Sequence, residues 1–241
     1  KDPYDNIIRQ VLGATLLLHD YRLSKDPALI EPVQRAVEWL KTNTRVFKLP
    51  DGQDAAYVYH ERESNLGSAG VALYLLSEYQ HLTGDTRYEE LSQMLNRFLM
   101  SQIMESGEFF YFYLYGGKRV VTPEDNQKHF LFYYPGEALL GMATYDRYVA
   151  IDDAEKTRAR AKIHKALKFL VGERLKIYQE FFLSLPSDSW LMMAVNELWD
   201  IPEMREELYK NFVYANADKM ITHMYTKEDA LFPDYVGSFY Y

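Results

Sequence analysis

The stretch that decides the fold runs from residue 67 to residue 102 and reads GSAGVALYLLSEYQHLTGDTRYEELSQMLNRFLMSQ. Its first half is rich in Gly, Ala and Leu, and its apolar residues recur at helical spacing up to the polar turn Thr83-Gly84-Asp85. Its second half keeps apolar residues on one face and is therefore amphipathic. The stretch predicts a helical hairpin, with a closely packed inner helix over 66–82 and a second helix that covers it.

A second stretch repeats this plan. Residues 135–170 read PGEALLGMATYDRYVAIDDAEKTRARAKIHKALKFL, again with a small-residue half, a polar turn and an amphipathic half. When Gly70 is aligned with Gly136, Tyr79 falls on Tyr145. Self-similarity over such a distance is the mark of a repeat architecture, in which each helical hairpin stacks on its neighbours.

The repeat extends to four hairpins. Residues 7–22 pair with 28–45, and residues 187–199 pair with 202–225, in the same order of inner and outer helix. The inner helix of the third hairpin is expected over 136–150 because its Gly, Ala and Leu content suits close packing. We therefore expect an all-α chain of four antiparallel helical hairpins.

The segments that link the hairpins carry strand signals. Aromatic residues alternate from Phe109 to Tyr115 and are followed by Gly116-Gly117, which predicts a β-hairpin over 108–121. No linker or low-complexity tract divides the chain, so we expect one domain over residues 1–241. The first residue is Lys1, not Met, and the last link stops early, so truncation at either end is left open. Localisation is left open too, with export slightly favoured.

Composition excludes several classes of function. The chain has 241 residues, of which 48% are apolar, and its net charge of -8 argues against nucleic acid as a partner. The absence of cysteine excludes disulfides, thiol nucleophiles, zinc fingers and iron-sulfur clusters. No apolar run approaches the roughly 20 residues that span a bilayer, so membrane insertion is not expected. The 21 tyrosines supply flat apolar faces that carry a hydroxyl, as walls of sugar-binding or peptide-binding sites do. The sequence leaves the oligomeric state open.

Glu137 is the sharpest candidate for a catalytic group. It follows Pro135-Gly136 in the first turn of a helix otherwise built of Ala, Leu, Gly and Met. Burial beside such an apolar face would raise the pKa of its carboxyl and leave a proton donor near neutral pH. The alternative, which general frequencies favour, is a first-turn glutamate that bonds the amides of its own helix.

Asp188 has the same ambiguity, with a helix cap favoured over catalysis. In the catalytic alternative it is the second carboxylate of a pair with Glu137, because glycoside cleavage needs an acid and a carboxylate roughly 5 to 9 Å apart. His60 and His129 lie in matching links and are candidate proton-transfer residues, whereas a metal site would need a third ligand and none is expected. Candidate substrate-binding residues in the links and at the helix starts are Tyr57, Tyr59, Asp125, Tyr133, Tyr134 and Trp190.

The repeated hairpins, the turn Thr83-Gly84-Asp85 and the strand start Gly107-Glu108-Phe109 resemble the α/α-toroid proteins, especially the six-hairpin glycosidase superfamily. This resemblance implies an α/α toroid whose inner helices start at the mouth of a central aromatic cavity. Four hairpins are fewer than six, so an incomplete or open ring is expected. Proteins of that shape include glycoside hydrolases, uronyl hydrolases, polysaccharide lyases, sugar epimerases, lanthionine cyclases and terpenoid cyclases, and the shape alone does not fix the chemistry.

The resemblance and the acidic helix starts together favour a carbohydrate-active protein. The first expectation is a hydrolase or lyase that acts on a polysaccharide through acidic residues in the cavity, with carbohydrate as partner and no cofactor. One alternative is a non-catalytic scaffold that holds a glycan or peptide. The other is a sugar epimerase or a cyclase, for which His60, His129 and Tyr134 would be the proton relay.

Overall fold

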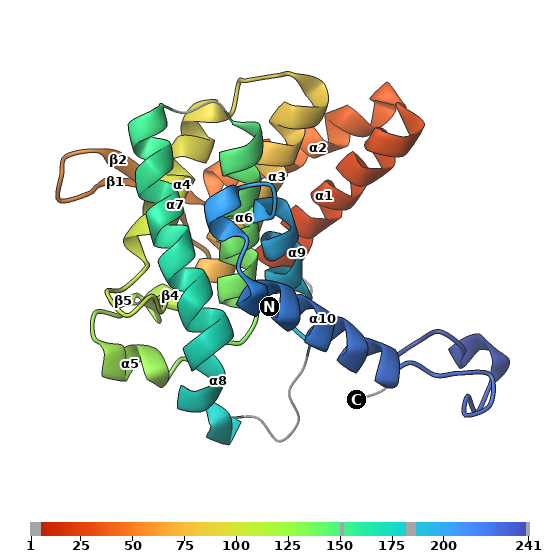
Figure 1. The fold of residues 1–241 in the computed structure, drawn as a ribbon. Coiled ribbons are helices and arrows are strands. Elements are labelled where there is room, and N and C mark those ends of the chain that lie inside the picture. The colour runs from red at the N-terminus through yellow and green to blue at the C-terminus, as the bar shows by residue number, and fades with distance from the viewer. Residues whose placement is uncertain (1–5, 150–151, 182–186, 240–241) are drawn as a thin grey trace.

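The computed structural model describes residues 6–149, 152–181 and 187–239, and these are mostly helical (Figure 1). The long helices form four hairpins in chain order: α1 (Ile7–Ser24) with α2 (Ile30–Thr42), α3 (Leu66–Thr83) with α4 (Glu89–Ser101), α6 (Tyr134–Tyr148) with α7 (Asp153–Lys168), and α9 (Ser189–Leu198) with α10 (Glu207–Thr222). Short helices are α5 (Pro123–Gln127), α8 (Arg174–Ile177), a π-helical turn at Phe169–Glu173, and 3-10 turns at Pro27–Leu29, Gln179–Phe181, Pro202–Met204 and Pro233–Tyr235. The four hairpins expected from the sequence are therefore present.

The inner helices α3 and α6 pack in parallel with almost no gap. A methyl group added at Gly70 would come within 2.6 Å of the Ala138 backbone, and one added at Gly67 would collide with Glu137 at the start of α6. The N-terminal ends of α3 and α6 therefore lie side by side. The inner helix expected over 136–150 begins two residues earlier, because Pro135 occupies the first turn, where its missing amide hydrogen costs nothing.

The helices α1 and α9 extend the row on its two sides. His19 of α1 hydrogen-bonds Tyr74 of α3 at 3.2 Å, and Gly136 of α6 lies against Trp190 at the start of α9. The order in space is α1, α3, α6, α9, with all four helices running the same way. The row shows that the helical hairpins repeat side by side. That the row closes into a toroid stays a prediction.

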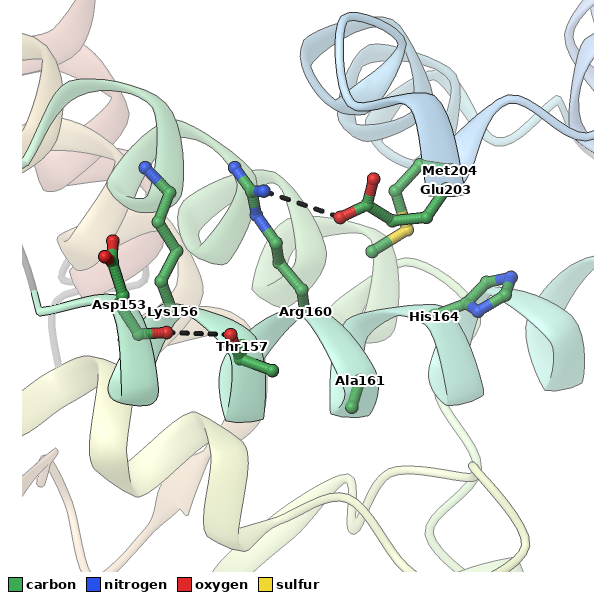
Figure 2. A pocket seen from close by; sticks show the side chains of 8 residues that line it. All are labelled: Asp153, Lys156, Thr157, Arg160, Ala161, His164, Glu203 and Met204. Atoms are coloured by element: carbon green, nitrogen blue, oxygen red, sulfur yellow. Dashed lines mark hydrogen bonds and ion pairs between the residues drawn. The ribbon is translucent and has the colours of Figure 1, made fainter.

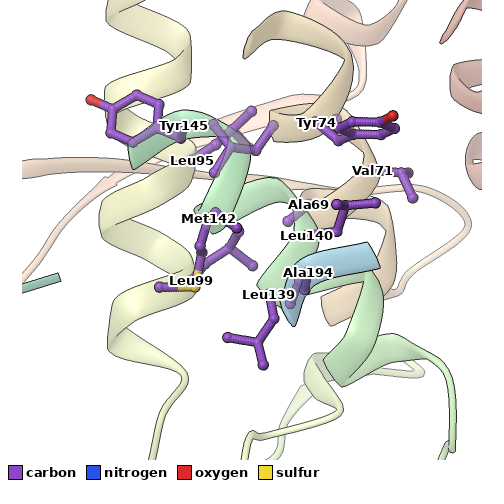
Figure 3. Close-up of a cluster of buried hydrophobic side chains, with 14 of the residues drawn as sticks. Ala69, Val71, Tyr74, Leu95, Leu99, Leu139, Leu140, Met142, Tyr145 and Ala194 are labelled. Carbon is purple, nitrogen blue, oxygen red and sulfur yellow. The ribbon is translucent and has the colours of Figure 1, made fainter. Parts of the chain in front are cut away.

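The core lies between this row and the outer helices. Figure 3 shows Leu95 and Leu99 of α4 facing Met142 of α6, while Val71, Leu140 and Ala194 fill the space around α3, α6 and α9. These side chains are almost completely buried. At about 25 cal/mol per Å² of apolar surface removed from water, such burial is the dominant stabilising contribution in a chain of this size.

The links form two small antiparallel sheets. The β-hairpin expected over 108–121 is present but shorter, with β4 (Phe112–Tyr115) paired to β5 (Lys118–Arg119) around the Gly-Gly turn, and β3 (Ser64–Asn65) joins β4 on its other side. A second hairpin, β1 (Thr44–Lys48) with β2 (Asp54–Val58), pairs Thr44 with Val58 and Lys48 with Asp54. The sequence analysis did not predict β1, because Thr44 to Lys48 had been assigned in part to the preceding helix.

The link aromatics pack on one another, which differs from the aromatic cavity expected from the sequence. The Tyr57 and Tyr113 rings lie 4.8 Å apart, and Phe47 and Phe98 contact both. Arg119 covers the Tyr113 ring at 3.7 Å. Edge and tilted contacts of this kind fix the two sheets against α4, so Tyr57 belongs to a packed aromatic cluster.

Within the described residues, no helix is both long and apolar enough to cross a bilayer.

Candidate functional site

A polar cleft of about 160 Å³ opens where the inner helices begin. Its lining residues come from the start of α1, from the link before α3 and from the start of α6: Asn6, Ile7, Val58, His60, Glu61, Glu63, Asn65, Ser68 and Tyr134. This is the end of the inner helices at which the sequence analysis placed the candidate residues. Carboxylates, an amide, a hydroxyl, an imidazole and an aromatic ring together suit a small ligand rich in hydroxyl groups.

One wall of the cleft is formed by the tight turn from His60 to Glu63. His60 and Glu63 exchange backbone hydrogen bonds at 2.8 and 2.9 Å, and the two residues between them, Glu61 and Arg62, have φ angles of 48° and 68°. Non-glycine residues adopt this left-handed conformation at a cost of about 1 kcal/mol or more, and they persist where the surroundings fix them. Asn65 then caps α3 by accepting a hydrogen bond from the Ser68 amide at 2.8 Å.

Glu137 lies in the first turn of α6, in the same turn as Tyr134, and is not among the residues that line the cleft. Its side chain is buried, and Oε2 has no hydrogen-bond partner among the described residues. A methyl at Gly67 would occupy the position of that oxygen and would also touch the Tyr134 ring, so the carboxyl sits between α3 and Tyr134. Burial raises the pKa of Glu137 to about 7, and the negative charge of Asp188 adds to the rise.

The carboxylate of Glu137 does not bond the amides of its own helix. No such hydrogen bond is present in α6, all of which is described. A first-turn glutamate that served as a cap would accept one or more of them, and its pKa would fall. The direction of the pKa shift agrees with the expectation from the apolar helix sequence, whereas the catalytic role itself stays a prediction.

Asp188 is held in a buried ion pair. Its Oδ2 accepts a hydrogen bond from the Arg174 guanidinium at 2.8 Å, and its Oδ1 accepts one from the Leu191 amide at 3.1 Å. Both charged side chains are 1% exposed. The pKa of Asp188 is raised above its usual value, because the effect of burial exceeds the opposing effects of the guanidinium and the amide. Because the guanidinium cannot lose its proton, the pair is ionised, and Asp188 caps α9 in the way the sequence analysis favoured.

The two carboxyl groups therefore differ in their partners. Asp188 is held in place by a cation, whereas burial and, to a smaller extent, the charge of Asp188 raise the pKa of Glu137 to about 7. Here Asp188 has no free oxygen for chemistry, so its contribution is the charge that it sets beside Glu137.

Tyr134 connects Glu137 to the cleft. Burial, together with the charges of Glu137 and Glu63, raises the pKa of the Tyr134 hydroxyl to about 12. Glu63, a residue of the same link as His60, is thus near the same ring. Glu63 is not among the residues predicted from the sequence, because nothing in the sequence distinguishes it from Glu61.

The other predicted residues lie at several distances from this cleft. His60 lines it, whereas the His129 ring lies 4.1 Å from Tyr115 and 5.9 Å from Phe112, on the β4–β5 side. Asp125 lies on α5, where it pairs with Lys128 at 2.8 Å in solvent. The remaining aromatics are placed as follows: Tyr59 meets the Tyr57 ring edge-on, Tyr133 is 41% exposed beside Phe132, and Trp190 packs partly buried against α6.

Arg174 is a buried residue beside the predicted site that the sequence did not point to. It follows a basic helix and a π-helical turn, and its neighbours in the sequence give no sign that it is buried. Only the fold brings it to Asp188, 14 residues later, and to the Phe132 carbonyl, whose oxygen accepts a hydrogen bond at 3.0 Å. A buried arginine between two helix starts has no local signature.

A groove of about 370 Å³ lies elsewhere, along the outer helix α7 (Figure 2). Three of its charged or titratable groups, Arg160, His164 and Glu203, take part in ion pairs. Arg160 binds Asp146 at 2.9 Å and Glu203 at 3.5 Å, and His164 binds Glu206. Such pairs stabilise the contact between α7 and the turn at Pro202–Met204, so we assign this groove a structural role. Among the described residues, no group of three or more acidic, histidine or cysteine side chains is arranged to hold a metal ion.

Comparisons with known proteins were made for sequence and for structure. No family model matches the chain, and none of the curated proteins matches its sequence. Among solved structures, the cellobiose 2-epimerase from Spirochaeta thermophila DSM 6192 is similar over 93% of this chain and 76% of its own, with 10% sequence identity and a TM-score of 0.48. Sugar epimerases are among the proteins that the sequence resemblance named. Similarity at this level carries no conclusion about activity, and the proposals below rest on the residues of this chain.

Proposed function

We propose that the chain is a carbohydrate-active enzyme that acts on one sugar ring at a time, with Glu137 as the proton donor. The observation that carries the proposal is the Glu137 carboxyl itself, which is buried, has an oxygen without a partner in the described part of the chain, and has a pKa raised to about 7. A group with a pKa near the working pH is the most effective general acid.

The cleft supports a small, hydroxyl-rich substrate. Its volume of about 160 Å³ is below the roughly 300 Å³ at which pockets for drug-sized ligands begin. One sugar ring is a ligand of that smaller class, and the polar lining supplies donors and acceptors for its hydroxyls. We therefore expect action on a chain end or on a free sugar, in preference to the middle of a long polysaccharide.

In the hydrolytic form of the proposal, the protonated Glu137 carboxyl gives its proton to the glycosidic oxygen as the bond to the ring carbon breaks. Glu63, near the same tyrosine ring, is the carboxylate available to stabilise the positive charge on the ring or to activate water. The Asp188 anion would then favour return of the proton to Glu137 and restore the starting state.

A second form, an epimerase, is favoured by the imidazole of His60 in the same cleft. An epimerase needs one group to remove a proton beside a carbonyl and another to return a proton to the same carbon from the other side. His60 and Glu137 are the two groups that this chain offers for these roles. A C–H bond breaks and forms again at one carbon while the glycosidic bond stays intact, so the products differ from those of hydrolysis.

The test uses Glu137→Gln, which keeps the shape of the side chain and removes its proton chemistry. Purified protein is incubated with neutral and acidic oligosaccharides and with free aldoses, and the products are followed by NMR. We expect a loss of about 100-fold or more in turnover, since general acid catalysis contributes about that much. Release of a terminal sugar indicates hydrolysis, and a changed epimer without cleavage indicates the second form.

Glu78→Gln is the matched control, because Glu78 is also a buried glutamate of an inner helix but lies far from the cleft. It should keep full turnover. Equal activity of Glu137→Gln and the unmodified protein would contradict the catalytic role. Sugar binding without turnover in either protein would identify a binding scaffold.

A further inference from the structure

A second pocket, of about 220 Å³, lies between α8 and α10. Its walls are mainly apolar, from Phe132, Leu175, Phe212 and Ala215. Two cationic side chains, Arg174 and Lys219, reach the same space. The pocket has no part in the cleft described above, with which it shares no lining residue.

Lys219 is a partly buried cation without an acidic partner in the described part of the chain. Burial alone lowers the pKa of its ammonium group, and no carboxylate acts against this. Phe212, Asn216 and Lys219 are spaced four and three residues apart, so they share one face of α10, and this face forms a wall of the pocket. A cation that is withdrawn from water without a counter-charge is a place where an anion binds favourably.

Arg174 supplies the second polar group. It is 1% exposed, and two of its nitrogens are occupied, by the Phe132 carbonyl and by Asp188. Its Nε has no partner among the described residues, although it is buried. A buried N–H without an acceptor costs about 1 to 3 kcal/mol, and a ligand oxygen in the pocket would remove that cost.

The nearby polar atoms of the protein already have partners, so they do not act as acceptors for Arg174 Nε or for Lys219. Asn216 already accepts a hydrogen bond from the Asp188 amide at 3.1 Å and donates one to the Phe212 carbonyl at 2.9 Å. The Asp188 carboxylate is used by Arg174 and by the Leu191 amide. The pocket thus offers a positive charge and a free N–H donor within apolar walls, and no free acceptor from these residues.

We infer that this pocket binds a small carboxylate whose ring has an apolar face, with the carboxylate between Lys219 and Arg174 and the ring against Phe132 and Phe212. Aromatic walls accept either the flat face of an aromatic acid or the C–H face of a sugar acid. Both kinds of ligand carry the carboxylate, and the experiment below distinguishes between them. The inference stands whether or not Glu137 is catalytic.

The experiment measures binding of benzoate and of glucuronate to the full chain by calorimetry, with benzamide and glucose as the matched neutral compounds. We expect at least one acid to bind about tenfold or more tightly than its neutral counterpart, since a hydrogen bond to a charged group contributes about 1.5 to 3 kcal/mol. The acid that binds more tightly identifies the kind of ring. No preference for either acid over its neutral counterpart would overturn the inference.

Two variants locate the binding. Lys219→Met removes the charge and keeps most of the side-chain volume, so it should weaken binding of the preferred acid about tenfold. Ala215→Phe, at an exposed position in the pocket wall, should block it. Lys210→Met is the control, because Lys210 lies on the same helix but pairs with Glu207 at 3.2 Å. Equal losses in Lys210→Met and Lys219→Met would show a general charge effect and contradict the site.

Discussion

The two ends of the inner helices each bury a glutamate, and the two differ in their partners. Glu137 lies at the end where the helices start, and Glu78 lies toward the other end, on α3. Burial raises the pKa of both carboxyls. Arg22 lies 3.5 Å from Glu78 and lowers its pKa, whereas Glu137 has only the anion Asp188 beside it. Burial therefore raises the pKa of the carboxyl at both ends, and the two ends differ in the sign of the charge beside the carboxyl.

The largest expected effect is on stability, when the arginine beside the buried carboxylate is replaced at one end and then at the other. Arg174→Met should lower the free energy of unfolding by about 3 to 5 kcal/mol, because it leaves the Asp188 charge buried and unpaired. Arg22→Met should lower it by less than about 1 kcal/mol, because Arg22 is half exposed and its pair is screened by water. Urea unfolding of both variants measures the difference, and equal losses would show that the two ends do not differ as described.

The pH dependence of stability should differ between the ends. The pKa of Glu137 rises from its usual 4.5 to about 7, so the folded protein binds more protons than the unfolded chain in this range. Stability should therefore fall by about 3 kcal/mol as pH rises from about 4.5 to 7, at about 1.4 kcal/mol per pKa unit. Glu137→Gln should remove this slope, as measured by urea unfolding at several pH values.

Glu78→Gln is the comparison for that experiment. The Glu78 carboxyl lies beside the Arg22 guanidinium, which acts to lower its pKa. Removing this carboxyl should therefore change the pH slope of stability less than Glu137→Gln does. Should both variants leave the slope of the unmodified protein intact, the raised pKa of Glu137 would be refuted, and with it the contrast between the two ends.

A smaller effect tests the position of the Glu137 carboxyl. In Gly67→Ala the new methyl would collide with that carboxyl and with the Tyr134 ring, and overpacking of this kind costs about 1 to 3 kcal/mol. Gly13→Ala, on α1, meets no atom within 4 Å and should gain up to about 1 kcal/mol, since alanine favours a helix more than glycine does. Thermal unfolding of both variants gives the comparison, and a stabilising Gly67→Ala would place the carboxyl elsewhere.

Much of the fold could be predicted from local sequence, because a helical hairpin is defined by neighbours in the chain. The apolar spacing and the polar turn of 67–102 are sufficient for α3 and α4, and the same holds for α6 with α7. The β1–β2 hairpin was missed because its first strand has no alternating pattern, and its stability comes from the Phe47 and Tyr57 rings, which pack on α4 and Tyr113.

The sequence by itself determined that Glu137 would stand in an apolar first turn, which left two outcomes open, a raised pKa through burial or a helix cap. Only the tertiary structure decided which charges surround it. Arg174 reaches Asp188 because α8 folds back onto the start of α9, and Gly67 admits the Glu137 carboxyl because α3 and α6 touch at their backbones. The physical reason is that apolar periodicity is a property of one segment, whereas the pairing of buried charges depends on which distant segments meet.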